Sequence, residues 1–173
     1  MKNLLSTIAA VLLLFTANNI QASSIKTGNI AITNTSSLQP VYDAYFTVKD
    51  ALIKSDAKLT SAKAKDLLAA ITAVKMDQLK KEEHTIWMKV VKKLTADTKN
   101  IVAATDLKKQ RENFKAVTKS TYDLIKISKS EQVVYKQYCP MADADWLSKE
   151  KAVKNPYYGS SMLTCGNVVE TIK

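Results

Sequence analysis

The chain has 173 residues, 46% of them hydrophobic, and a formal net charge of +10 from 26 Lys and Arg against 16 Asp and Glu. An excess of basic residues makes nucleic acid a candidate partner, but nucleic-acid sites favour clustered arginine. Arg111 is the only arginine and the lysines are interleaved with Asp and Glu, so we expect a solvated basic surface and no nucleic-acid binding.

Residues 1–22 have the pattern of a secretory signal peptide. Lys2 supplies the positive start, Leu4–Phe15 the short apolar core, and Ala22 a small residue before the expected cleavage at Ser23. The apolar run is shorter than the roughly 20 residues that a membrane-spanning helix needs, which disfavours the alternative of an uncleaved anchor. We therefore expect a periplasmic protein with no stable membrane insertion after signal cleavage.

Residues 23–37 are rich in Ser, Thr and Asn and lack apolar periodicity, so we predict a flexible leader. The remainder, 38–173, is expected to form a single domain, because a chain of this length can bury one core. Within this domain, 38–130 carries helical patterns, whereas 131–173 carries both cysteines and four of the seven tyrosines.

Apolar residues recur at helical spacing in four stretches of 38–130. The expected helices run from near Pro40 to Ser55, from a cap at Thr60 or Ser61 to about Leu79, from about His84 to Val102, and from a cap at Thr105 or Asp106 to about Ser128. The charged run Lys80–Glu83 is expected to connect the second helix to the third. Short links between amphipathic helices predict an antiparallel, up-down-up-down four-helix bundle.

The pattern changes after Ser130. Val133–Tyr138 and Asn167–Ile172 are β-leaning, and we expect them to pair as a small hairpin-like ribbon. This pairing brings Cys139 and Cys165 toward each other. The predicted fold class is therefore mainly α, an antiparallel four-helix bundle with a C-terminal, loop-rich segment that contains a small β-ribbon.

Each cysteine has a methionine close to it in the sequence: Met141 follows Cys139, and Met162 precedes Cys165. Thiolates and thioethers are soft ligands that suit Cu(I), so these four residues are candidate copper ligands. The alternative is a disulfide between Cys139 and Cys165, which an exported protein can form, with the two methionines as core residues. The residues by themselves leave both interpretations open.

His84 is a further candidate metal ligand. His84 and Met88 lie one turn apart on the expected third helix, a spacing at which two side chains can chelate a soft or borderline metal. The alternative is a histidine that is simply exposed or packed. Trp87, between them, is expected in the core.

Familiar enzyme templates are absent from the sequence. It contains no GxSxG, no HExxH and no Gly-rich phosphate loop. A cysteine hydrolase would rest on His84 with Cys139 or Cys165, and nothing else in the chain supports it. We therefore expect a protein that is not an enzyme.

Nearly all of the chain after the leader resembles the DUF3347 family, which occurs as small exported proteins and as a domain of CusB-like adaptors of heavy-metal efflux pumps. The blocks that carry the resemblance are Tyr45, Lys49–Leu52, Ser55–Ala57, His84-x-x-Trp87-Met88, Asp106-Leu-x-x-Gln110-Arg111-x-x-Phe114, Tyr138–Ala142, Trp146–Ser148, Asn155–Gly159 and Met162-Leu-x-Cys165-Gly166. The chain departs from the family at Asp143–Asp145, where Gly-Ala is common.

The resemblance implies handling of copper or a related metal. It leads us to expect a stand-alone periplasmic protein that binds Cu(I) and is linked to heavy-metal homeostasis or efflux. Expected partners are the metal ion and an efflux adaptor or another envelope protein. The alternative is an interaction module of the cell envelope with a structural Cys139–Cys165 disulfide.

Overall fold

Four helices precede a small sheet in the computed structural model, which describes residues 36–128 and 132–173. The expected signal peptide, 1–22, and leader residues 23–35 lie outside the described residues. All described residues belong to one unit, Thr33–Lys173. No helix among them has the length and apolar character needed to cross a bilayer.

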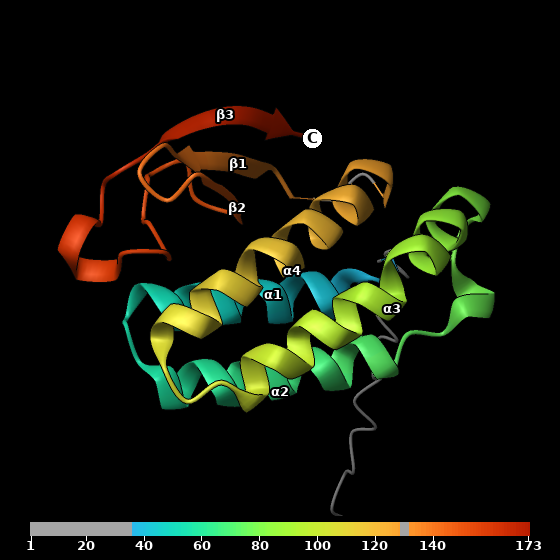
Figure 1. Cartoon of the computed structure of the whole chain (residues 1–173). Coiled ribbons are helices and arrows are strands. Elements are labelled where there is room, and N and C mark those ends of the chain that lie inside the picture. The colour runs from blue at the N-terminus through green and yellow to red at the C-terminus, as the bar shows by residue number, and fades with distance from the viewer. Residues whose placement is uncertain (1–35, 129–131) are drawn as a thin grey trace, which may run out of the picture. The chain divides into compact units, whose positions relative to one another are not determined.

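The described helices are α1 (Gln39–Ile53), α2 (Ala57–Thr72), α3 (Lys81–Ala103) and α4 (Leu107–Ser128), with a short 3₁₀ turn, η1 (Met76–Gln78), before α3. Each helix packs against the next along the chain, and α4 also contacts α1. Figure 1 shows the sheet above α4 and α1, away from α2. The chain is therefore mainly helical, and one side of the helical layer supports the sheet.

The ends of the helices follow local capping chemistry. The expected starts of the second and third helices were wrong. The cap of α2 is Asp56, whose carboxylate accepts from the Leu59 N–H at 2.8 Å, whereas Thr60 lies inside the helix and donates to the Asp56 carbonyl. Helix α3 begins at Lys81, before His84, because the Glu83 side chain accepts from the Lys80 N–H and closes the first turn.

The cap of α4 agrees with expectation, since Asp106 accepts from the Lys109 N–H at 2.8 Å. The expected second helix is too long at its C-terminal end. It ends at Thr72, and Leu79 is partly buried from the link before α3 instead of from a helix face.

The sheet contains β1 (Val134–Cys139), β2 (Ala144–Ser148) and β3 (Asn167–Ile172) in the order β2-β1-β3, with both pairings antiparallel. The predicted pairing of the first and last of these strands is confirmed. Strand β2 was not predicted. It forms because Asp143, with φ of 45°, turns the chain tightly back along β1, and because Trp146 and Leu147 are buried.

Tyr45 joins the helices to the sheet. Its ring stacks on Phe114 of α4 with centroids 5.1 Å apart. Its hydroxyl lies 2.9 Å from the Thr118 hydroxyl and accepts from the Leu147 N–H of β2 at 3.0 Å. One buried side chain of α1 therefore fixes the position of β2 over α4.

Candidate functional site

The end of β1 and the approach to β3 bring the two cysteines together. Cys139 is the last residue of β1, and Cys165 stands two residues before β3, whose Asn167 pairs with Tyr138. The two Sγ atoms are 2.9 Å apart and both thiols are free. Cys139 is fully buried, whereas Cys165 is partly exposed. The expectation that the ribbon juxtaposes them is therefore confirmed.

The backbone around Cys165 is tightly constrained. Gly166 has φ of +135°, and a Cβ placed there would lie 2.8 Å from both the Trp146 ring and the Tyr138 carbonyl oxygen. Only glycine accepts this conformation and this closeness without strain. Gly166 thus allows the chain to pass directly over Trp146 and to present Cys165 to Cys139.

The two thiols differ in acidity. Burial raises the pKa of the Cys139 thiol, but hydrogen bonds from Cys165, from the Ala142 and Met141 backbone and from the Asn155 side chain outweigh it and hold the pKa below its usual value. The Cys165 thiol shares a hydrogen bond with Cys139 in which either sulfur can donate, and this bond, together with desolvation, raises the pKa of Cys165. The pair therefore loses its first proton from Cys139 and retains the second on Cys165.

This geometry suits either of two products. A disulfide has its sulfur atoms about 2.05 Å apart, so bond formation requires a small approach. A metal held about 2.3 Å from each sulfur in tetrahedral geometry requires them to separate to roughly 3.7 Å. Either product therefore requires a change in the distance between the two sulfur atoms, which are now 2.9 Å apart.

The two methionines near this pair are surface residues. The side chain of Met141 is 64% exposed and that of Met162 is 37% exposed. A methionine that fills a gap in a core is buried, whereas both of these side chains are exposed. The interpretation of Met141 and Met162 as core residues is therefore wrong. Met141 follows Cys139 in the turn to β2, and Met162 ends η2 (Gly159–Met162), where its carbonyl accepts from the Cys165 N–H. Each methionine thus stays within three residues of its cysteine.

The structure does not bring His84 to the sulfur atoms. Ser36 donates to Glu83 at 3.0 Å, which places the start of α3 beside the start of α1. A Cβ on Gly159, near the cysteines in sequence, would instead meet Ser55 and Ile53 at the other end of α1. That helix has 15 residues, which corresponds to about 22 Å. The structure therefore places His84 away from the two cysteines, contrary to the expected grouping.

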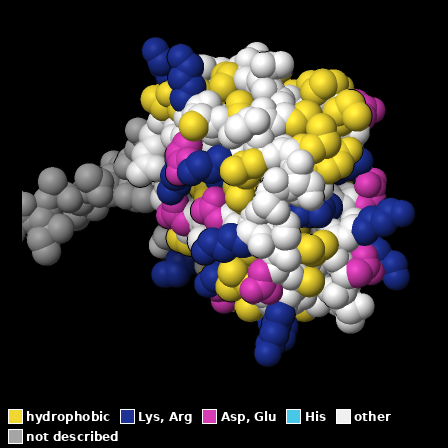
Figure 2. All heavy atoms as spheres, turned by 90° about the vertical axis from the view of Figure 1, so that its left-hand side faces the viewer, with side chains coloured by type: hydrophobic (Ala, Val, Ile, Leu, Met, Phe, Trp, Pro, Cys, Tyr) yellow, Lys and Arg dark blue, Asp and Glu magenta, His cyan; other side chains and the backbone are white. Residues whose placement is uncertain are grey.

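Two other observations agree with this correction. Figure 2 shows the end of the molecule that carries η2, and no histidine is visible on that face, although hydrophobic side chains reach the surface in several patches between charged ones. Within residues 36–128 and 132–173, no group of three or more His, Cys, Asp and Glu side chains is placed to hold a metal. A metal here would depend on the two thiolates and on thioethers.

A family model described as "Protein of unknown function (DUF3347)" matches residues 41–133, which cover the four described helices apart from the first two residues of α1. The chain belongs to the DUF3347 family. No curated protein and no solved structure matches it. In this DUF3347 protein the cysteines and both nearby methionines lie beyond the matched range, so the family match itself assigns nothing to them.

Sequence reasoning did not identify Asn155 as a site residue. It is fully buried, its side-chain N–H donates to the Cys165 carbonyl at 2.8 Å, and its side-chain oxygen accepts from the Tyr157 N–H at 2.8 Å. The Asn155-Pro156 pair predicted only a turn. Asn155 in fact holds the Cys165 segment against the rest of the loop, so it positions one of the two thiols.

Arg111 was also missed as a positioning residue. Its Nε donates to the Pro156 carbonyl at 2.9 Å, and its Nη2 donates to the Ser55 hydroxyl at 2.9 Å and to the Leu52 carbonyl at 3.3 Å. Burial lowers the pKa of this guanidinium. Its occurrence as the only arginine in a lysine-rich DUF3347 chain was the available signal, because a planar fork can bridge several acceptors where a lysine cannot.

Proposed function

We propose that this DUF3347 protein is a periplasmic soft-metal-binding protein that holds Cu(I) through Cys139 and Cys165, with Met141 and Met162 as thioether donors. The observation that carries the proposal is the pair of free thiols 2.9 Å apart, each with an exposed methionine within three residues. The four helices, arranged as an antiparallel bundle, serve as the scaffold. His84 takes no part in this site.

The chemistry of the donors favours a soft monovalent metal. Two sulfur atoms with different acidity supply one thiolate readily and a second when a metal displaces the Cys165 proton. Thioethers add soft, neutral donors without further proton loss. The process is capture and transfer of metal, not catalysis, in heavy-metal homeostasis or efflux, with an efflux adaptor or another envelope protein as the recipient.

The test is a Cu(I) competition titration of the reduced protein against a chromogenic chelator. The double substitution Cys139→Ser/Cys165→Ser is expected to weaken Cu(I) binding by at least about a hundredfold, since even loss of an outer-shell partner costs ten- to a hundredfold. Met141→Leu/Met162→Leu is expected to give a smaller loss.

The matched control is Met76→Leu/Met88→Leu, which removes two methionines that are also exposed, 50% and 55%, but are far from the cysteines in the sequence. It should leave the affinity unchanged, as should His84→Ala. Binding by the double cysteine variant as tight as that of the unaltered protein would refute the proposal.

A second function is favoured by the same short sulfur separation. An envelope interaction module with a structural Cys139–Cys165 disulfide needs the two sulfurs adjacent and needs no metal. Native mass spectrometry of freshly isolated protein separates the two proposals. A metal-free mass lower by the two thiol hydrogens supports the disulfide module, whereas a metal adduct that is lost on alkylation of both thiols supports the metal site.

A further inference from the structure

A second site lies between the start of α4 and the loop that carries the tyrosines. A pocket of about 440 Å³ is lined on the helix side by Lys108, Arg111, Glu112 and Lys115, and on the loop side by Met141, Ala142, Tyr157 and Tyr158. Nothing in the proposed metal chemistry uses its helix side. The helix wall is charged and the loop wall is apolar and aromatic, and this difference indicates what kind of ligand the pocket takes.

The helix wall carries excess positive charge. It presents three cationic side chains against the single carboxylate of Glu112, and that carboxylate already pairs with Lys115 at 3.1 Å. Within the described part of the chain, no carboxylate forms an ion pair with Lys108 or Arg111. The wall therefore has two cations without a counter-charge.

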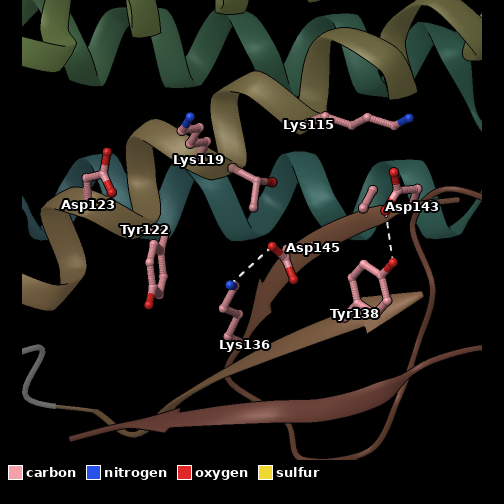
Figure 3. Close-up of a pocket in the computed structure, with 10 residues that line it drawn as sticks. Lys115, Lys119, Tyr122, Asp123, Lys136, Tyr138, Asp143 and Asp145 are labelled. Atoms are coloured by element: carbon pink, nitrogen blue, oxygen red, sulfur yellow. Dashed lines mark hydrogen bonds and ion pairs between the residues drawn. The ribbon is translucent and has the colours of Figure 1, made fainter. Parts of the chain in front are cut away.

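The neighbouring pocket provides a contrast. It has about 400 Å³ and lies between α4 and the sheet. Figure 3 shows that Lys136 points to Asp145 and that the Tyr138 hydroxyl points to Asp143 within this pocket. The lining includes three lysines and three aspartates. An excess of positive charge is thus a property of the pocket beside Arg111, not of the whole α4 surface.

Arg111 is held in place with part of its guanidinium unused. Three hydrogen bonds engage Nε and Nη2, and none among the described residues engages Nη1. Nη1 is also not among the buried atoms that lack a partner, so it remains reachable. A half-buried guanidinium without an anion is costly, and an incoming anion that contacts Nη1 would offset that cost without rearrangement of the protein.

The loop wall is apolar and aromatic. Tyr157 is only 6% exposed and packs on Phe114, and Tyr158 donates through its hydroxyl to the Met141 carbonyl at 2.9 Å. These contacts fix the two rings and the Met141 backbone opposite the cations. A ligand that fills the pocket needs an anionic group for one wall and an apolar or flat body for the other.

We propose that this pocket binds a small organic carboxylate, with the carboxylate on Arg111 Nη1, Lys108 and Lys115 and the apolar body against Tyr157, Tyr158 and Met141. This pocket shares Met141 with the proposed metal site, so the carboxylate proposal is tested on the metal-free protein. A planar guanidinium with free N–H groups matches a carboxylate, and the aromatic wall favours an organic anion over an inorganic one.

The experiment is isothermal titration calorimetry of the metal-free full chain with three probes at constant ionic strength: benzoate, inorganic phosphate and benzyl alcohol. Benzoate should bind saturably. Benzyl alcohol, which lacks the charge, and phosphate, which lacks the apolar body, should each bind at least about tenfold more weakly, given the usual strength of hydrogen bonds to charged groups.

The variant Lys108→Gln/Lys115→Gln should weaken benzoate binding by about tenfold or more. The matched control Lys89→Gln/Lys92→Gln removes the same charge from exposed positions on α3 and should bind like the unaltered protein. Circular dichroism checks that every variant is folded.

Three results would overturn the proposal: no saturable binding of benzoate, phosphate bound as tightly as benzoate, or an equal loss in both double lysine variants. Copper binding is read separately, since neither lysine pair belongs to the sulfur site. Failure of the carboxylate site therefore leaves the metal proposal standing, and the reverse also holds.

Discussion

At the scale of single residues, the two thiols of the site differ in burial and in acidity. Cys139 is buried at a strand end with several donors around it, and its pKa lies below the usual value, whereas Cys165, which is hydrogen-bonded to it, has a raised pKa. The candidate sulfur donors could be identified from the sequence. The difference in acidity could not, because it arises from the hydrogen bond between the two thiols and from the backbone N–H groups and Asn155 that the fold brings to Cys139.

This asymmetry predicts a pH dependence of Cu(I) binding. Between the two pKa values the metal displaces one proton, from Cys165, so the apparent dissociation constant should rise about tenfold for each pH unit of acidification. Below the lowered Cys139 pKa two protons are displaced and the slope should double. A chelator competition series over pH measures this, and Cys165→Ser should remove the upper, single-proton limb. An affinity independent of pH would contradict the assignment of thiolate ligands.

At the scale of elements, local signals placed the helices well and their ends less well. Asp56 and Asp106 both cap helices through the N–H three residues later. Asp106 was predicted as a cap from the sequence, but for the second helix Thr60 or Ser61 was named and Asp56 was not. The Thr60 side chain is buried, and its hydroxyl donates to the Asp56 carbonyl. Capping preferences alone do not predict that Thr60 is used in this way inside the helix.

Removal of the α2 cap is expected to destabilise the protein. Asp56→Ala leaves the Leu59 N–H without its side-chain acceptor and should lower the free energy of unfolding by about 1 kcal/mol. The control Asp66→Ala removes a carboxylate of the same helix that makes only an exposed pair with Lys63, and should change stability by less than about 0.5 kcal/mol. Urea denaturation compares the two, and equal effects would argue against Asp56 as the cap.

At the scale of the whole described molecule, the sheet depends on the helices for its position. Tyr45 contacts Phe114 and the Thr118 hydroxyl on α4 and accepts from the Leu147 N–H on β2. Arg111 makes a comparable link at the end of α1, because it binds Leu52, Ser55 and Pro156. The sulfur pair thus sits in a loop system that is anchored to α1 and α4.

Tyr45→Phe tests this anchoring. The change keeps the ring but leaves the buried Leu147 N–H without its acceptor, so it should lower the free energy of unfolding by about 2 kcal/mol. The matched change Tyr158→Phe removes a hydroxyl whose single bond to the Met141 carbonyl is exposed, and should cost less than about 1 kcal/mol. Chemical denaturation followed by fluorescence measures both, and an equal loss in the two variants would contradict the role given to Tyr45.

Four helices, the pairing of Val133–Tyr138 with Asn167–Ile172 and the identity of the sulfur donors could all be predicted before the fold was known, because hydrophobic period and residue chemistry are local properties. The folded chain was needed to show that His84 stands at the far end of α1 from Cys139 and Cys165. It was also needed to show that β2 forms and that Arg111 lines a pocket without a counter-charge. These outcomes depend on which helix ends lie together and which loop covers them. Both are set by packing between segments that are far apart in the chain.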